Sequence, residues 1–161
     1  MSVAFTREES AETAAEVALP DRPVSPHPNL VTAAGLGALE KAMAEARATY
    51  DAAQQIEDVN ERRRAAAPAF RDIRYFAERL RTAQLVPSSA AGDLVAFGNR
   101  VTFRRDDGRR QVFRIVGEDE ADPRNGLISY VSPVSRALIG KAVGDVAVLG
   151  DGEIEVLAIA E

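Results

Sequence analysis

The sequence predicts an α+β protein in which an antiparallel coiled-coil helical hairpin precedes a small antiparallel β domain with one short helix. Two observations lead to this prediction. In residues 30–86, apolar side chains recur at steps of three and four, as along the seam of a coiled coil. In residues 94–161, short alternating apolar and polar runs are separated by Gly, Asp and Pro, which is typical of strands joined by turns.

The first arm of the hairpin is expected to begin at Thr32, a residue type that caps helices well. Its apolar positions are Leu36, Leu39, Met43, Ala46, Tyr50 and Ala53. The second arm continues the same spacing with Ile73, Phe76, Leu80 and Ala83. Neither arm can bury its stripe alone, so we expect the two arms to pack against each other.

The turn of the hairpin is expected near residue 58, which places the acidic stretch 57–61 at the tip. Two alternatives remain for the second helix. Proline is tolerated best in the first turn of a helix, so Pro68 favours a start near Ala66 or Ala67 and a tip loop of residues 57–66. Otherwise the first helix runs on through residues 62–64, which are three arginines, and the tip is basic.

Residues 1–29 form a predicted N-terminal extension. Thr6 and Glu9 match a capping box, which favours a short helix ending near Leu19. Four prolines between residues 20 and 28 exclude a helix and favour an extended linker. The extension is interpreted either as a mobile tail or as an arm that docks on a partner or on the C-terminal domain. His27 is expected to be an exposed linker residue without a functional role.

A linker at residues 87–93 leads into the C-terminal domain, residues 94–161. Strands are expected at 94–97, 100–104, 111–116, 127–131, 146–149 and 153–159. Gly108, after two aspartates, predicts the turn of a hairpin. Ser132 is expected to cap the short helix, with Pro133 in its first turn and Gly140 just beyond its end.

Composition excludes several classes of function. The formal charge of −5 argues against a general nucleic-acid binder. There is no cysteine and one histidine, which excludes a disulfide framework, a thiol nucleophile and a histidine-rich metal centre. No apolar run reaches the roughly 18 residues of a membrane helix, and the N-terminus lacks the order of a signal peptide. We therefore expect a cytoplasmic protein without a membrane partner, and a monomer.

Residues 113–145 carry a series of recognisable short motifs: Phe113-Arg114-Ile115-Val116-Gly117, Asp119-Glu120, Ile128-Ser129, Ser132-Pro133, 136–141 and Val143-Gly144-Asp145. Together they resemble the C-terminal domain of the bacterial GreA/GreB transcript cleavage factors, and GreB more than GreA. Residues 30–35 and 74–86 also resemble the two ends of that family's hairpin. The resemblance implies a coiled-coil hairpin followed by an FKBP-like domain.

The resemblance also implies a ligand of the secondary channel of bacterial RNA polymerase that contacts the nascent RNA 3′ end only indirectly. In that family two acidic residues at the tip help position a Mg²⁺ ion at the polymerase active site, and backtracked RNA is cleaved faster. Asp58 and Glu61 match those acids, with Glu57 as a helper. Ile128, Ser132 and Pro133 match the polymerase contact. The chain would be an accessory factor rather than an enzyme, without a cofactor of its own.

Two departures from the family pattern leave alternatives. The hairpin is shorter by several residues on each arm, which reduces its reach by roughly 10–15 Å. Counting back without gaps from Arg74 places the first tip acid near Ala52, with no acid three residues on. The chain could then be a non-cleaving competitor of Gre factors, or a relative of the short-armed regulators of nucleoside diphosphate kinase. Prolyl isomerase activity is a more distant alternative, since the domain has few aromatic residues.

Overall fold

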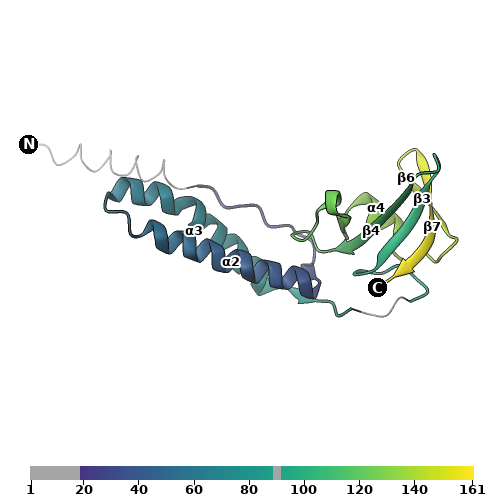
Figure 1. Ribbon diagram of the computed structural model, residues 1–161, viewed down its shortest axis with the longest axis horizontal. Coiled ribbons are helices and arrows are strands. Elements are labelled where there is room, and N and C mark those ends of the chain that lie inside the picture. Colours follow the sequence, from purple (N-terminus) through teal and green to yellow (C-terminus); the bar gives the residue numbers. More distant parts are fainter. Residues whose placement is uncertain (1–18, 89–91) are drawn as a thin grey trace, which may run out of the picture. The chain divides into compact units, whose positions relative to one another are not determined.

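The computed structural model describes residues 19–88 and 92–161, and these form two compact units (Figure 1). One unit contains the described residues up to Pro26 together with Leu39–Arg81. The other contains His27–Ala38 and the described residues of Thr82–Glu161. The base of the predicted hairpin therefore groups with the C-terminal strands. The short helix predicted before Leu19 lies outside the described residues.

The first unit is built on two antiparallel helices, α2 (Ala33–Ala53) and α3 (Val59–Thr82) (Figure 1). The predicted seam is confirmed, since Leu39, Met43, Ala46 and Ala53 are buried along α2. On α3 the same spacing continues toward the tip through two further buried alanines, Ala66 and Ala69. The rings of Tyr50 and Phe70 meet across the arms with centroids 5.9 Å apart. The residues predicted for the second arm are less buried: Ile73, Phe76 and Leu80 are half-buried, and Ala83 lies just beyond the end of α3.

Helix α3 begins at Val59, so both predicted alternatives for the tip were wrong in detail. Helix α2 ends at Ala53 and does not run through the arginines, and the tip loop does not extend to residue 66. The early start follows from Asp58, which accepts a 2.7 Å hydrogen bond from the Glu61 N–H and so caps the helix. Pro68 consequently lies inside α3 and leaves one carbonyl without its helical donor.

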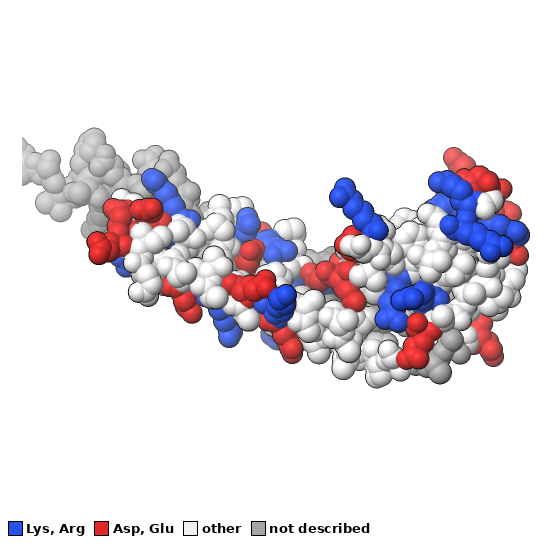
Figure 2. Space-filling view, viewed as in Figure 1, with Lys and Arg blue, Asp and Glu red and all other residues white. Residues whose placement is uncertain are grey.

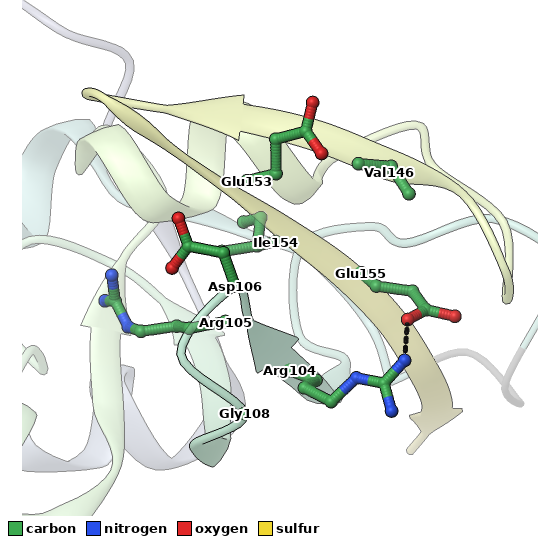
Figure 3. Close-up of a pocket in the computed structure, with 8 residues that line it drawn as sticks. All are labelled: Arg104, Arg105, Asp106, Gly108, Val146, Glu153, Ile154 and Glu155. Atoms are coloured by element: carbon green, nitrogen blue, oxygen red, sulfur yellow. Dashed lines mark hydrogen bonds and ion pairs between the residues drawn. The ribbon is translucent and has the colours of Figure 1, made fainter.

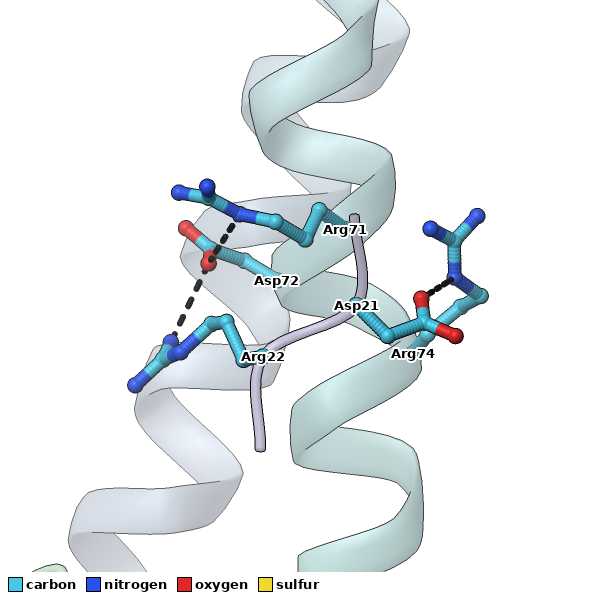
Figure 4. A network of polar contacts seen from close by, with 5 residues as sticks. All are labelled: Asp21, Arg22, Arg71, Asp72 and Arg74. Atoms are coloured by element: carbon cyan, nitrogen blue, oxygen red, sulfur yellow. Dashed lines mark hydrogen bonds and ion pairs between the residues drawn. The ribbon is translucent and has the colours of Figure 1, made fainter. Parts of the chain in front are cut away.

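Residues 19–26 contain no helix and lie as an extended strap along α3 (Figure 4), so the predicted extended linker is confirmed for these residues. Arg22 pairs with Asp72 at 3.1 Å, and Asp21 accepts a 2.6 Å hydrogen bond from Arg74. The Arg22 guanidinium also lies 3.8 Å from the centroid of the Tyr75 ring. Residues 21 and 22 of the arm thus contact the hairpin, whereas the carbonyl of Pro28 accepts a hydrogen bond from the Tyr130 hydroxyl of the C-terminal domain.

The base of the hairpin enters the second unit through a short parallel pair, β1 (Leu30–Val31) and β2 (Gln84–Leu85). Thr32 caps α2 as predicted, because its Oγ1 accepts a 2.9 Å hydrogen bond from the Gly35 N–H. The same hydroxyl donates to Glu120 at 2.6 Å, which ties the helix start to the loop after β4.

The second unit is a five-stranded sheet in the order β5-β4-β3-β7-β6. Its strands are β3 (Arg100–Arg105), β4 (Arg110–Val116), β5 (Leu127–Ser129), β6 (Val146–Leu149) and β7 (Gly152–Ala160). All pairings are antiparallel except β4–β5, which is parallel and was not anticipated. A 3₁₀ turn, η1 (Pro123–Asn125), precedes β5. The predicted strand at 94–97 is reduced to one isolated bridge between Leu94 and Ala142.

One face of this sheet carries the core. Val101 and Phe103 of β3 and Ile115 of β4 are fully buried beneath Leu138 of α4 (Pro133–Leu138). Because side chains alternate along a strand, the even-numbered residues 100–104 of β3 and 110–114 of β4 point to the opposite face, and Val116 at the end of β4 is also buried. The predicted fold class, a helical hairpin followed by a β domain with one short helix, is confirmed.

Candidate functional site

The predicted acidic tip is the turn between α2 and α3. The side chains of Glu57, Asp58 and Glu61 are all exposed there. Asp58 occupies the N-cap of α3, and Glu61 lies in the first turn of that helix. The 2.7 Å bond from the Glu61 N–H to Asp58 Oδ1 fixes the two residues relative to each other. The structure thus places both acidic residues singled out from the sequence at the start of α3.

Arg62 also belongs to this tip, although the sequence offered residues 62–64 only as a basic alternative to an acidic tip. Its side chain folds back across the turn, where Nε donates to the Ile56 carbonyl at 2.8 Å and Nη2 donates to the Glu57 carbonyl at 3.0 Å. These contacts satisfy carbonyls that no helix pairs. Arg63 and Arg64 are exposed in the same two turns of α3. Acidic and basic groups therefore share the tip, and no sequence motif indicated that Arg62 would close the turn.

The acidic tip offers two carboxylate side chains that could contact a metal ion. No group of three or more His, Cys, Asp or Glu side chains able to hold a metal exists among the described residues. Asp58 and Glu61 offer hard carboxylate oxygens, the ligand type that Mg²⁺ prefers, but too few for a complete site. A partner would have to supply the remaining ligands.

The three residues predicted to contact a partner in the second unit differ in accessibility. Ile128 is 6% exposed and belongs to the core of the sheet. Ser132 caps α4 as predicted, since its Oγ accepts from the Ser135 N–H at 3.2 Å and donates to Ser135 Oγ at 3.0 Å. Pro133 follows in the first turn and is exposed. Their role in binding stays a prediction, and Pro133 is the member of the group whose side chain is open to solvent.

An open hollow of about 390 Å³ lies beside the β3–β4 turn (Figure 3). Arg104 and Glu155 form an ion pair along one side of it, and Asp106 and Glu153 add two further carboxylates. Ile154 contributes an apolar wall. These side chains come from neighbouring strands and largely offset one another in charge, so we assign no ligand to the hollow.

Comparison with known proteins agrees with the sequence motifs. The family model described as transcription elongation factor GreA/GreB, C-terminal, matches residues 90–161. The GreA of Beijerinckia indica is 36% identical over 115 residues, which cover 65% of this chain and 68% of that protein. The chain belongs to the GreA/GreB family of transcription elongation factors. In the part of this family member that the structure describes, no helix is long and apolar enough to cross a membrane.

Other relatives of this GreA/GreB family member match over shorter stretches. The GreB of Neisseria meningitidis serogroup B is 43% identical over 95 residues, which cover 55% of this chain and 58% of that protein. The chain thus spans less than two thirds of that relative. Among solved structures, Gfh1 of Thermus thermophilus has a TM-score of 0.39 at 23% identity, covering 84% of this chain and 100% of that one. A GreA/GreB factor of Nitrosomonas europaea has a TM-score of 0.38 at 16% identity, covering 82% and 98%.

Proposed function

We propose that this GreA/GreB family member binds RNA polymerase and carries Asp58 and Glu61 into the secondary channel, where they stimulate cleavage of backtracked RNA. The observation that carries the proposal is the capped tip. Two exposed carboxylates are held one helical turn apart by the 2.7 Å bond between Glu61 N–H and Asp58 Oδ1. Family membership makes transcription elongation the process in which this tip would act.

The hairpin has the form that such a role requires. Helix α2 has 21 residues and α3 has 24, so the arms are about 31 Å and 36 Å long at about 1.5 Å per residue. The buried seam keeps them together as a slender rod, and the acidic residues lie at the end of it. A rod of this kind can enter a channel that would exclude a globular domain.

The chain's own contribution would be to orient two carboxylates. Mg²⁺ bound between them and the polymerase would supply a Lewis acid and an activated water for phosphodiester hydrolysis. Asp58 and Glu61 would hold the ion from one side, and the cap would keep their backbones fixed while they do so. The chain would act in the cytoplasm as an accessory factor, with the polymerase performing the hydrolysis.

The test uses stalled, backtracked elongation complexes with Mg²⁺ and measures release of short RNA from the 3′ end. Wild-type protein should accelerate release, and the double variant Asp58→Asn with Glu61→Gln should not. The Asp58→Asn substitution keeps a side-chain oxygen that can accept the capping bond, and the donor is the backbone N–H of residue 61, so folding should be preserved. A matched control is Glu40→Gln with Glu45→Gln, which removes the same charge from the exposed side of α2. Equal stimulation by wild type and the tip variant would sink the proposal.

A non-cleaving competitor for the same channel is a second candidate, and the position of Arg62 favours it. The guanidinium lies over the turn, and Arg63 and Arg64 are exposed in the next positions, so cations surround the acids that would have to hold a metal ion. Such a factor would bind polymerase and displace a cleaving Gre factor without releasing RNA. The variant Arg63→Gln with Arg64→Gln tests this second candidate. It should raise RNA cleavage only if the two cations prevent the carboxylates from holding a metal ion.

A further inference from the structure

The outer face of the sheet, opposite the core, carries an unusual arrangement of arginines. The β3–β4 register places Arg100 directly opposite Arg114, and Arg104 directly opposite Arg110. Thr102 and Val112 form the pair between them. We call the six residues the arginine face: Arg100, Thr102, Arg104, Arg110, Val112 and Arg114. In Figure 2, blue atoms gather in groups over this unit.

The arginine face is unfavourable for folding by itself. Like charges directly opposite each other in an antiparallel pair destabilise a sheet, and here this happens twice. Arg104 has a carboxylate partner in Glu155. Within residues 19–88 and 92–161, no carboxylate lies within ion-pairing distance of Arg100, Arg110 or Arg114. In addition, the Nε atom of Arg114 is buried there without a hydrogen-bond partner. Arg100, Arg110 and Arg114 destabilise the sheet, and no contact inside the described protein compensates for it. Such positions indicate a role in binding a partner.

The face has dimensions that suit a segment of a partner. Facing arginines have Cα atoms about 5 Å apart, and the two pairs are about 13 Å apart along the strands. Guanidinium groups recognise carboxylates and phosphates in a planar, two-point geometry, so the ligand is anionic. The two sites for anions lie on either side of a centre formed by Val112, which is 51% exposed.

The apolar centre favours an acidic protein over a nucleic acid. The outward residues between the arginine pairs are Thr102 and Val112, neither of them aromatic, so the face has no platform for stacking bases. Farther along the sheet, Val146 and Val148 are 51% and 71% exposed, and their pairing with Glu155 and Glu153 places them on the same face. Exposed aliphatic groups beside arginine are typical of protein interfaces, whereas a phosphate backbone offers them no apolar partner.

We propose that the arginine face docks onto an acidic segment of RNA polymerase in which an aliphatic side chain lies between two carboxylates. This rests on the proposed function, and it adds a contact surface separate from Ser132 and Pro133. Three of these arginines, Arg100, Arg104 and Arg110, are exposed on adjacent strands, and Arg114 is half-buried. The segment would therefore cross β3 and β4 together. Its carboxylates would relieve the repulsion between facing arginines that the free protein retains.

The test measures the Kd of the labelled full chain for core RNA polymerase at about 0.1 M salt. The variant is Arg100→Glu with Arg110→Glu, which changes two exposed, diagonal corners of the face. It should weaken binding about tenfold or more and reduce the salt dependence of Kd. The same variant should melt at a higher temperature than wild type, because each new glutamate faces an arginine. A merely structural role for these arginines would lower the melting temperature.

The matched control compares Arg110→Glu with Arg124→Glu, an equal change of charge at the exposed η1 turn. Equal weakening by both would show an effect of overall charge and overturn the inference. A Kd of the double variant equal to that of wild type would also overturn the inference. The proposed function would still stand in that case, because the wild type binds polymerase. Failure of the wild-type protein to bind polymerase would contradict both the proposed function and this inference. If the wild type bound a 20-base-pair DNA duplex more tightly than it binds core RNA polymerase, and the double variant lost this binding, the face would be a nucleic-acid surface instead.

Discussion

Oδ1 of Asp58 accepts a hydrogen bond of 2.7 Å from the backbone N–H of Glu61, so one carboxylate both begins α3 and lies beside the second acid of the tip. Structure and proposed chemistry therefore depend on the same side chain. A variant that removes the charge must be separated from one that removes the cap.

Asp58→Ala and Asp58→Asn should make that separation. Alanine cannot accept the capping bond, so the free energy of unfolding should fall by about 1 kcal/mol. Asparagine caps about as well as aspartate and should leave stability nearly unchanged. Both should lose RNA cleavage, since neither has a carboxylate. Chemical denaturation followed by circular dichroism checks the first point, and activity retained in Asp58→Asn would contradict the role of the charge.

Pro68→Ala should stabilise the hairpin. Pro68 lies inside α3 and cannot donate to the carbonyl four residues earlier, that of Arg64. Alanine restores the donor, and the side chain at this position is exposed, so no packing is lost. The free energy of unfolding should rise by about 1–3 kcal/mol. A melting temperature equal to or below that of wild type would show that the proline is accommodated without cost.

Gly117→Ala should destabilise the second unit. A Cβ atom at this position would lie 2.3 Å from the carbonyl oxygen of Leu30, and a backbone atom cannot move aside cheaply. We expect the free energy of unfolding to fall by about 2 kcal/mol or more. Gly37→Ala is the control, because nothing lies within 4 Å of its added methyl group and α2 should gain stability. Similar effects of the two substitutions would contradict the close approach of β1 to the end of β4.

Arg22→Ala should release the strap from α3. Arg22 pairs with Asp72 at 3.1 Å and stacks on Tyr75 at 3.8 Å, and alanine loses both contacts. The partly exposed ion pair and the cation–π contact together contribute about 1 kcal/mol. Hydrogen exchange at residues 21–25 should accelerate, and the ring protons of Tyr75 should shift in NMR spectra. Arg22→Lys should show a smaller change, because it keeps the charge.

Asp107 should give a local pH dependence at the β3–β4 turn. The backbone N–H of Arg109 and then its guanidinium hydrogen-bond to Asp107 and lower the pKa of its carboxyl below the ordinary value. A lowered pKa in the folded state means that this interaction stabilises the turn above the unfolded-state pKa. The stabilisation is lost as pH falls through the folded-state pKa. Arg109→Ala should raise the pKa of Asp107, as carboxyl NMR titration would show; an unchanged titration curve would contradict the assignment.

The seam of the hairpin could be predicted from sequence because steps of three and four residues are a direct record of helix geometry. The caps at Thr32 and Ser132 followed for a similar reason, since each is a short polar residue placed just before a helical pattern. The start of α3 was misplaced because Pro68 was weighed above Asp58. Within the folded hairpin, a good cap and the buried Ala66 and Ala69 outweigh one missing hydrogen bond.

The remaining features depend on contacts that no local pattern records. The parallel pairing of β4 with β5 is set by a long connection through η1. Arg62 closes the tip through two backbone carbonyls, which any arginine near a turn could reach. The arginine face becomes visible only when the β3–β4 register pairs residues six to fourteen positions apart. The folded geometry rather than residue preference decides all three.

Pro68 has one further consequence. On its N-terminal side, residues 59–67 carry Glu61 and three arginines; on its C-terminal side, the helix packs through larger side chains such as Ile73, Phe76 and Leu80. Proline inside a helix removes one backbone hydrogen bond and favours a kink. We therefore expect the tip of the hairpin to bend at Pro68 relative to the rest of α3.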